Sequence, residues 1–193
     1  GFFEDISKKI SNSNQPLISS CGRYSLVYNG EIYNVDALKR KYRPKNDGSS
    51  DTILLFELLQ SWGAEVLNDV EGMFAFVFYD QVKADFIAAR DAFGIKPLYF
   101  HENTGEIVFC SESGLLAKLY SKDYCPLGLE EWSLLRKPIS GHTVWKDVHE
   151  VQPGCYRNKA GEIRYFNLEP NSDEFNQEEF EYLLMQSITS HLV

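Results

Sequence analysis

The sequence predicts an α+β fold built on antiparallel sheets. Short β-type segments follow one another through the middle of the chain, and helical segments come in blocks instead of alternating one-to-one with strands. The segment Met73–Tyr79 is apolar at every position, which is typical of a strand covered on both faces. At 193 residues, 44% of them apolar, the chain is long enough for one domain with a real core.

The charge balance argues against polyanionic partners. The chain carries 19 basic and 28 acidic residues, a formal net charge of −9. Nucleic acids and anionic membrane surfaces need clustered Lys and Arg, so we predict no nucleic-acid partner and no membrane partner. No run of about 18 apolar residues occurs that could span a bilayer.

The cysteines and histidines are scattered along the chain. None of them forms the close ligand pairs that a zinc site requires, so we predict no metal site. A core of this size needs no disulfides, and we expect reduced thiols and a cytoplasmic location. The positions are Cys21, Cys110, Cys125, Cys155, His101, His142, His149 and His191.

The first elements follow a polar opening that runs through Pro16 and reads as a loop. Arg23–Tyr28 has a strand pattern, and a second strand-like run follows at Glu31–Tyr33. Asn29-Gly30 lies between the two runs, and this dipeptide is a strong signal for a hairpin turn. We therefore expect a hairpin centred on Asn29 and Gly30.

Helices are predicted next, around Val35–Lys41 and from Asp51 onward. The second of these carries apolar residues at helical spacing and ends at Gly63, and a further short helix is expected over Glu65–Asp69. The apolar positions of the long helix are Leu55, Leu58, Leu59 and Trp62.

The rest of the chain alternates short strands and short helices, with turns at Gly94 and at Asn103–Gly105. After Met73–Tyr79, strands are expected at Asp85–Arg90, Pro97–His101 and Glu106–Cys110, then near Thr143–Trp145, Gly154–Arg157 and Glu162–Phe166; helices are expected at Ser113–Tyr120 and Gly128–Arg136. Glu169–Asp173 reads as a linker, and a last helix begins near Phe175. Its apolar stripe, most simply a packing surface, is Phe180, Leu183, Leu184 and Ile188.

Two short motifs have both a structural and a functional interpretation, and a third has a structural one. Asn29-Gly30-Glu31 is a turn followed by a solvent-facing Glu, or else an Asn side-chain amide and a Gly N–H that together stabilise an oxyanion, with Glu31 holding an ammonium group. Asp51 is a helix N-cap, or a binding carboxylate. Arg90-Asp91, before Phe93–Pro97, reads as a tight turn locked by an ion pair between the two residues.

Several motifs in consistent order resemble one family. From about Gln15 to the end, the chain looks like the glutaminase domain of glutamine-hydrolysing asparagine synthetases, which are class II glutamine amidotransferases. The motifs are Asn14–Leu17, Gly22–Tyr24, Asn29–Asn34, Ser50–Thr52, Gly72–Phe76, Arg90–Tyr99 and Ser111-Glu112.

The resemblance implies a fold and a reaction. The fold would be the four-layer αββα sandwich of N-terminal nucleophile hydrolases, lacking its first strands here. An N-terminal cysteine thiolate would attack the glutamine amide, with its own α-amino group as base. Asn29 and Gly30 match the oxyanion hole, and Glu31 and Asp51 match the carboxylates that hold the substrate ammonium. No cofactor is implied for this part of the chain.

The chain departs from the family at its beginning, where Gly1 stands in place of the nucleophilic cysteine. Cys21 precedes Asn29 by only eight residues, too few for the strands that the family places between nucleophile and oxyanion hole. We therefore expect that Cys21 is not the nucleophile, that the chain is cut at both ends, and that it does not hydrolyse glutamine by itself.

The resemblance also divides the chain. Residues 1–168 would form a partial glutaminase domain, and residues 169–193 a linker and first helix leading to an ATP- and magnesium-dependent synthetase domain outside the sequence. The implied partners are glutamine and that domain, and a homodimer is compatible with the sequence. Two alternatives remain: a degenerate amidotransferase-like module that serves in binding or assembly, or the glutaminase domain of an enzyme that amidates a different acceptor.

Overall fold

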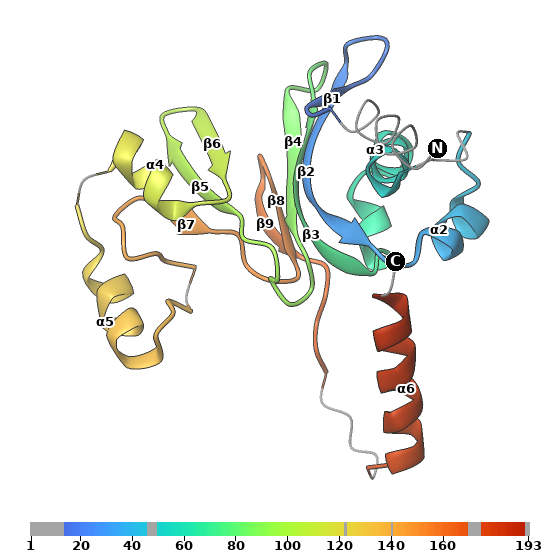
Figure 1. The fold of residues 1–193 in the computed structure, drawn as a ribbon. Helices are drawn as coiled ribbons and strands as arrows, with labels where there is room; N and C mark the ends of the chain where they lie inside the picture. Colours follow the sequence, from blue (N-terminus) through green and yellow to red (C-terminus); the bar gives the residue numbers. More distant parts are fainter. Residues whose placement is uncertain (1–13, 46–49, 122, 140, 170–174, 192–193) are drawn as a thin grey trace, which may run out of the picture.

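The structure, a computed structural model, describes residues 14–45, 50–121, 123–139, 141–169 and 175–191. Two sheets lie face to face between helices (Figure 1). The larger sheet has the strand order β1-β2-β3-β4-β8-β9 and the smaller one β6-β5-β7, and every pairing is antiparallel. This arrangement confirms the predicted α+β class.

The elements closely follow the predicted order. The strands are β1 (Leu17–Ile18), β2 (Tyr24–Ile32), β3 (Gly72–Asp80), β4 (Asp85–Arg90), β5 (Tyr99–Asn103), β6 (Glu106–Cys110), β7 (His149–Glu150), β8 (Cys155–Asn158) and β9 (Gly161–Arg164). The helices are α2 (Val35–Tyr42), α3 (Asp51–Trp62), the 3₁₀ helix η1 (Gly63–Asn68), α4 (Ser113–Tyr120), α5 (Pro126–Leu135) and α6 (Gln177–Ser190).

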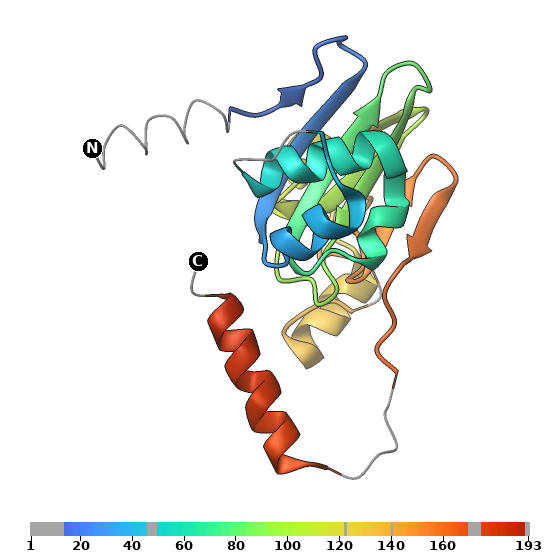
Figure 2. The same ribbon diagram turned by 90° about the vertical axis from the view of Figure 1, so that its right-hand side faces the viewer.

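Three apolar clusters fill the three spaces between four layers. The first lies between α2, α3 and the larger sheet, and includes Leu58 and Phe76. The second lies between the sheets and includes Phe86 of β4 and Phe100 of β5. The third joins the smaller sheet to α4 through Leu116. Figure 2, turned by 90°, shows α2 and α3 in front of the larger sheet.

The strand β3 has two apolar faces because it contributes to two of these clusters. Phe74, Phe76 and Phe78 pack toward α3, whereas Ala75 and Val77 pack toward the smaller sheet. The prediction that this strand is covered on both sides is confirmed.

The predicted hairpin at Asn29-Gly30 is wrong. β2 runs unbroken from Tyr24 to Ile32 and pairs with β3 along its whole length, with Asn29 opposite Ala75 and Gly30 opposite Phe74. The physical reason is the close approach of the two backbones. A Cβ on residue 30 would lie 2.7 Å from the Phe74 Cα, so the glycine serves strand packing instead of a turn.

Two other predictions near the end of the chain also change. Thr143–Trp145 forms no strand, because the Thr143 hydroxyl donates to the carbonyls of Trp145 and Val148 and so organises a local turn. The stripe Phe180, Leu183, Leu184 and Ile188 stays exposed on α6, where no described residue is buried. The predicted linker at Glu169–Asp173 lies almost wholly outside the described residues.

Candidate functional site

The candidate site is built on the outer edge of β2. Alternate residues of a strand direct their backbone groups to opposite sides. Tyr33, directly after β2, donates its N–H to Glu71 on the β3 side, whereas Tyr24 and Tyr28 bond to residues on the other side. The even-numbered residues of β2 therefore present their N–H and C=O groups away from β3. We call this row, residues 24 to 32, the β2 edge.

Gly30 lies in the middle of the β2 edge. By this alternation its N–H points outward, and no hydrogen bond found among the described residues occupies it. Because Gly30 has no side chain, this part of the edge is accessible. An outward-facing amide is the kind of donor that an oxyanion needs.

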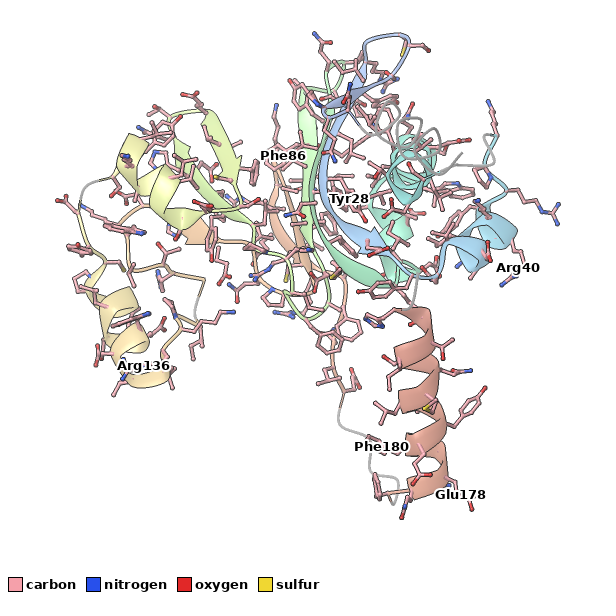
Figure 3. All side chains as sticks on the ribbon, viewed as in Figure 1. Tyr28, Arg40, Phe86, Arg136, Glu178 and Phe180 are labelled. Carbon is pink, nitrogen blue, oxygen red and sulfur yellow. The ribbon has the colours of Figure 1, made fainter. Side chains whose placement is uncertain are left out.

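Asn29 and Glu31 flank this amide, and their side chains share one face of the sheet. They lie on the face opposite Tyr28, whose ring points toward α3 (Figure 3). The Asn29 side chain is exposed and the Glu31 side chain is half-buried. The structure thus brings together the three residues that the motif predicts, with an amide and a carboxylate beside an open N–H.

Asp51 reaches the same strand from the opposite face, at the start of α3. Its Oδ2 accepts hydrogen bonds from the Tyr28 hydroxyl (2.7 Å) and the Ile32 N–H (3.2 Å), and its Oδ1 accepts one from the Thr52 N–H (2.6 Å). The interpretation of Asp51 as the helix N-cap is wrong. Ser50 holds that place because its hydroxyl accepts from the Ile53 N–H.

The environment of this region favours the protonated form of two tyrosines, Tyr28 and Tyr33. Burial, and then the carboxylate of Asp51, raise the pKa of Tyr28 far above its usual value. Burial, followed by the charges of Glu31 and Asp91, raises the pKa of Tyr33 as well.

Arg90 and Asp91 do not pair with each other, contrary to the predicted ion-paired turn. The Arg90 guanidinium pairs with Glu150 (2.6 Å) and donates to the carbonyls of Gly94, Lys96 and Val151. The Asp91 carboxylate, fully buried, accepts four backbone N–H groups, from Phe74, Phe93, Ile95 and Lys96. The motif is a buried junction between the two sheets, and its chemistry is structural.

Cys21 lies on the loop between β1 and β2, at the far end of the strand from Gly30. Six residues of strand separate Tyr24 from Gly30, about 20 Å at the usual rise. A hydrogen bond with Ser19, then one with the Arg23 backbone, lowers the pKa of the exposed Cys21 thiol. The expectation that Cys21 is not the nucleophile of this site agrees with its position.

Sequence reasoning missed two residues that matter here. Gln15 holds the Tyr28 backbone with its side chain, donating to the carbonyl (2.7 Å) and accepting from the N–H (2.6 Å). Glu150 is the buried partner of Arg90. Gln15 belongs to the motif Asn14–Leu17, but its partner Tyr28 is 13 positions away, and Glu150 is 60 positions from Arg90, so neither contact has a local signal.

A cavity of about 710 Å³ lies between Tyr33, which follows β2, Glu71 and the last turns of α6. The Tyr33 ring also contacts the His191 ring, with 4.1 Å between centroids. Within the described ranges, no group of three or more His, Cys, Asp or Glu side chains could hold a metal ion. The helices described are all too short or too polar to cross a membrane.

Comparison with known proteins bears on this geometry. The profile of the glutamine amidotransferase domain matches residues 6–167. Asparagine synthetase B [glutamine-hydrolyzing] of Escherichia coli is 29% identical over 183 residues, which cover 93% of this chain and 30% of that protein. Asparagine synthetase [glutamine-hydrolyzing] 2 of Bacillus subtilis is 34% identical over 116 residues, covering 60% of this chain and 15% of that protein.

A solved structure shows the same fold. Glutamine phosphoribosylpyrophosphate amidotransferase from B. subtilis superposes with a TM-score of 0.50 at 22% identity, covering 80% of this chain and 32% of that one. The chain spans about a third of the length of the curated relatives that it matches over most of its own length. The family profile, which covers most of the chain, and the antiparallel two-sheet fold agree: the chain belongs to the glutamine amidotransferase domain family.

Proposed function

We propose that this domain hydrolyses the side-chain amide of glutamine and supplies the ammonia to an ATP-dependent amidation of aspartate, as the glutaminase part of an asparagine synthetase. The observation that carries the proposal is the open Gly30 N–H between Asn29 and Glu31, in a chain of this family. The names of the relatives support aspartate as the acceptor.

The residues present suit the first half of such a reaction. A thiolate attacks the amide carbon of glutamine, and the carbonyl oxygen gains negative charge. The Gly30 N–H and the Asn29 side-chain N–H donate to that oxygen, and the charge is stabilised as it develops. The C–N bond then breaks, ammonia leaves with the proton that the α-amino group of the nucleophilic cysteine took from its thiol, and water hydrolyses the thioester to glutamate and the free thiol.

We assign the substrate ammonium chiefly to Glu31. Asp51 contributes its negative charge from the other side of β2, while its oxygens also hold Tyr28, Ile32 and Thr52. We further propose that the nucleophilic thiol is none of the four cysteines of this sequence, and that the 193 residues alone release no ammonia from glutamine. Ammonia release by the isolated chain would overturn this assignment.

We propose that residues 1–168 form the glutaminase domain and that residues 169–193 lead toward a synthetase domain. The family profile ends at residue 167, yet the alignment with the E. coli relative covers 93% of the chain and so extends into α6. ATP and Mg²⁺ belong to the synthetase domain in this proposal, and no residue described here is assigned to either.

The test uses the protein expressed from its complete open reading frame. Asparagine formation is measured with glutamine and, separately, with ammonium as the nitrogen source. The variant Asn29→Ala should lower glutamine-dependent turnover about 100-fold or more, because one oxyanion donor is lost, and should leave the ammonium-dependent rate unchanged. Equal loss of both rates would contradict the proposed role of Asn29.

The variant Asp51→Asn separates charge from structure. We expect weaker use of glutamine with nearly intact use of ammonium, since the second active site is untouched. Loss of both activities, together with a lower unfolding midpoint, would assign Asp51 to the structure alone.

Replacement of aspartate by other carboxylic acids in the same assay tests the acceptor, and size-exclusion chromatography tests whether the protein is a homodimer.

A further inference from the structure

Within the part of the chain that the structure describes, every outward-facing residue of the β2 edge except one has a hydrogen-bond partner. Ser19 bonds the backbone of Tyr24 through its own N–H and its hydroxyl, and β1 pairs with Leu26. The Gln15 side chain holds Tyr28, and the Asp51 carboxylate accepts the Ile32 N–H. Among the described residues only Gly30, between the last two, keeps its N–H open.

The Gln15 contact has the geometry of a strand pairing made by one side chain. Its carboxamide donates from Nε2 to the Tyr28 carbonyl at 2.7 Å and accepts at Oε1 from the Tyr28 N–H at 2.6 Å. These are the two bonds that a residue of a neighbouring strand would make. Gln15 therefore fixes β2 two residues before Gly30 without covering the Gly30 amide.

We infer that Gln15 is a positioning residue for the Gly30 N–H. It holds the β2 edge on one side of Gly30 as Asp51 holds it on the other, so that the Gly30 amide is aimed at the oxygen of the bound amide substrate. This inference rests on the proposed function, because it names the residue that orients the oxyanion donor.

The physical argument concerns how tightly a donor must be placed. Glycine is the most flexible residue, and beyond its short pairing with β1 the described part of β2 is held by a strand only on the β3 side. Displacement of a catalytic group by about 1 Å can cost about 100-fold in rate. Two short hydrogen bonds at Tyr28 remove much of that freedom, and the effect should fall on turnover more than on substrate affinity.

The test compares Gln15→Ala and Gln15→Glu with Ser19→Ala in the protein expressed from its complete reading frame. Gln15→Glu keeps the acceptor for the Tyr28 N–H but sets an oxygen against the Tyr28 carbonyl. Ser19→Ala is the matched control. It removes the side-chain acceptor of the Tyr24 N–H, a hydrogen bond on the same edge but six residues before Gly30. Glutamate release from glutamine is measured over a range of concentrations.

Both Gln15 variants should lower kcat for glutamine hydrolysis about 10-fold to 100-fold, with KM changed by less than about 3-fold and the ammonium-dependent rate unchanged. Ser19→Ala should match the wild type. An unchanged kcat, or a loss that lies wholly in KM, would overturn the inference while leaving the proposed function intact.

A second measurement is independent of activity. In ¹⁵N relaxation of the 193-residue chain, Gln15→Ala should lower the order parameter of the Gly30 amide from the value of rigid backbone, near 0.85, and leave Phe76 of β3 unchanged. An equally rigid Gly30 in wild type and variant would overturn the inference. If the wild-type protein releases no glutamate, the proposed function fails, and the relaxation result still decides whether Gln15 holds the strand.

Discussion

Gly30 is the residue whose replacement should separate backbone packing from chemistry most clearly. An added methyl group would lie 2.7 Å from the Phe74 Cα, and the backbone atoms of β3 cannot give way without moving the strand. We expect Gly30→Ala to lower the free energy of unfolding by about 1–3 kcal/mol and to abolish glutamine hydrolysis. Urea denaturation and a glutaminase assay measure the two effects.

Gly114 offers the matched control for this prediction. It lies in α4, and a Cβ placed there meets no atom within 4 Å. Gly114→Ala should therefore stabilise the protein slightly, by about 0.4–1 kcal/mol, because the native backbone accepts a side chain there and alanine restricts the unfolded chain more than glycine does. If Gly30→Ala unfolds at the wild-type midpoint, β2 and β3 do not approach as closely as described.

Single residues also show where sequence reasoning was sufficient. The grouping of Asn29, Gly30 and Glu31 at one place could be predicted from the motif because the three residues are consecutive, and their chemical roles stay a prediction. The turn could not be rejected, since the partner that makes Gly30 necessary, Phe74, lies 44 positions away. The cap was misplaced by one residue, from Ser50 to Asp51, since both side chains are good caps.

At the scale of elements, the contact between Arg90 of β4 and Glu150 of β7 should behave as a buried ion pair. Arg90 and Glu150 are both nearly inaccessible to solvent, and Arg90 donates to three carbonyls besides. Removal of one partner leaves a buried charge without compensation. Glu150→Ala should destabilise the protein by about 3–5 kcal/mol. Chemical denaturation measures this.

The control for this pair is Glu102→Ala, which breaks the contact between Arg157 and the largely exposed Glu102 side chain. Exposed ion pairs contribute little, and salt screens them further. The unfolding midpoint should stay close to that of the wild type. Equal effects of Glu102→Ala and Glu150→Ala would contradict the assignment of the junction as a buried structural pair.

The edge strand β7 should make stability depend on pH. Burial, and then the charge of His142, lower the pKa of His149 below its ordinary value of 6.5, with Arg157 and His101 acting in the same direction and Asp147 opposing. As pH falls below about 6.5 the unfolded state takes up a proton first, so stability decreases until pH passes the folded-state pKa.

The variant His149→Gln should flatten that part of the profile. We expect the wild-type urea midpoint to fall between pH 7 and pH 5, and the variant to lose most of this slope. His191→Gln, on the exposed helix α6, serves as the control and should keep the wild-type slope. A variant profile parallel to the wild type would show that other groups carry the pH dependence.

Most elements could be predicted because their signals are local. The periods of 2 and 3.6, and the turn residues, placed α3, β4, β6 and α4 within a residue or two. The predictions failed at Asn29-Gly30 because the pairing with Phe74, distant in sequence, decides the conformation. They failed at Thr143–Trp145 because the Thr143 hydroxyl does so. Neither kind of contact produces a periodic pattern in the sequence.

For the whole molecule, the four layers close around three apolar clusters, but α6 contributes to none of them. Its Phe180 and Glu178 side chains extend from a helix set apart from the sandwich (Figure 3), and its apolar residues are roughly half exposed. A stripe of this kind is typical of a surface that another part of a protein covers. This is consistent with the proposal that α6 belongs to the segment beyond the glutaminase domain.

A pair of leucines tests this division on the 193-residue chain. Leu58 of α3 is almost wholly buried in the first cluster, and Leu58→Ala should cost about 2–5 kcal/mol of the free energy of unfolding. Leu184 of α6 is 46% exposed, and Leu184→Ala should change that free energy by no more than about 0.5 kcal/mol. Urea denaturation followed by tryptophan fluorescence compares the two free energies of unfolding.

If Leu184→Ala lowers the free energy of unfolding as much as Leu58→Ala, then α6 packs on the sandwich and the boundary near residue 168 is wrong. Leu184→Ala could also have a small effect on the free energy of unfolding of this chain and a large effect in the protein expressed from its complete reading frame. That result would show that α6 packs against sequence outside the 193 residues.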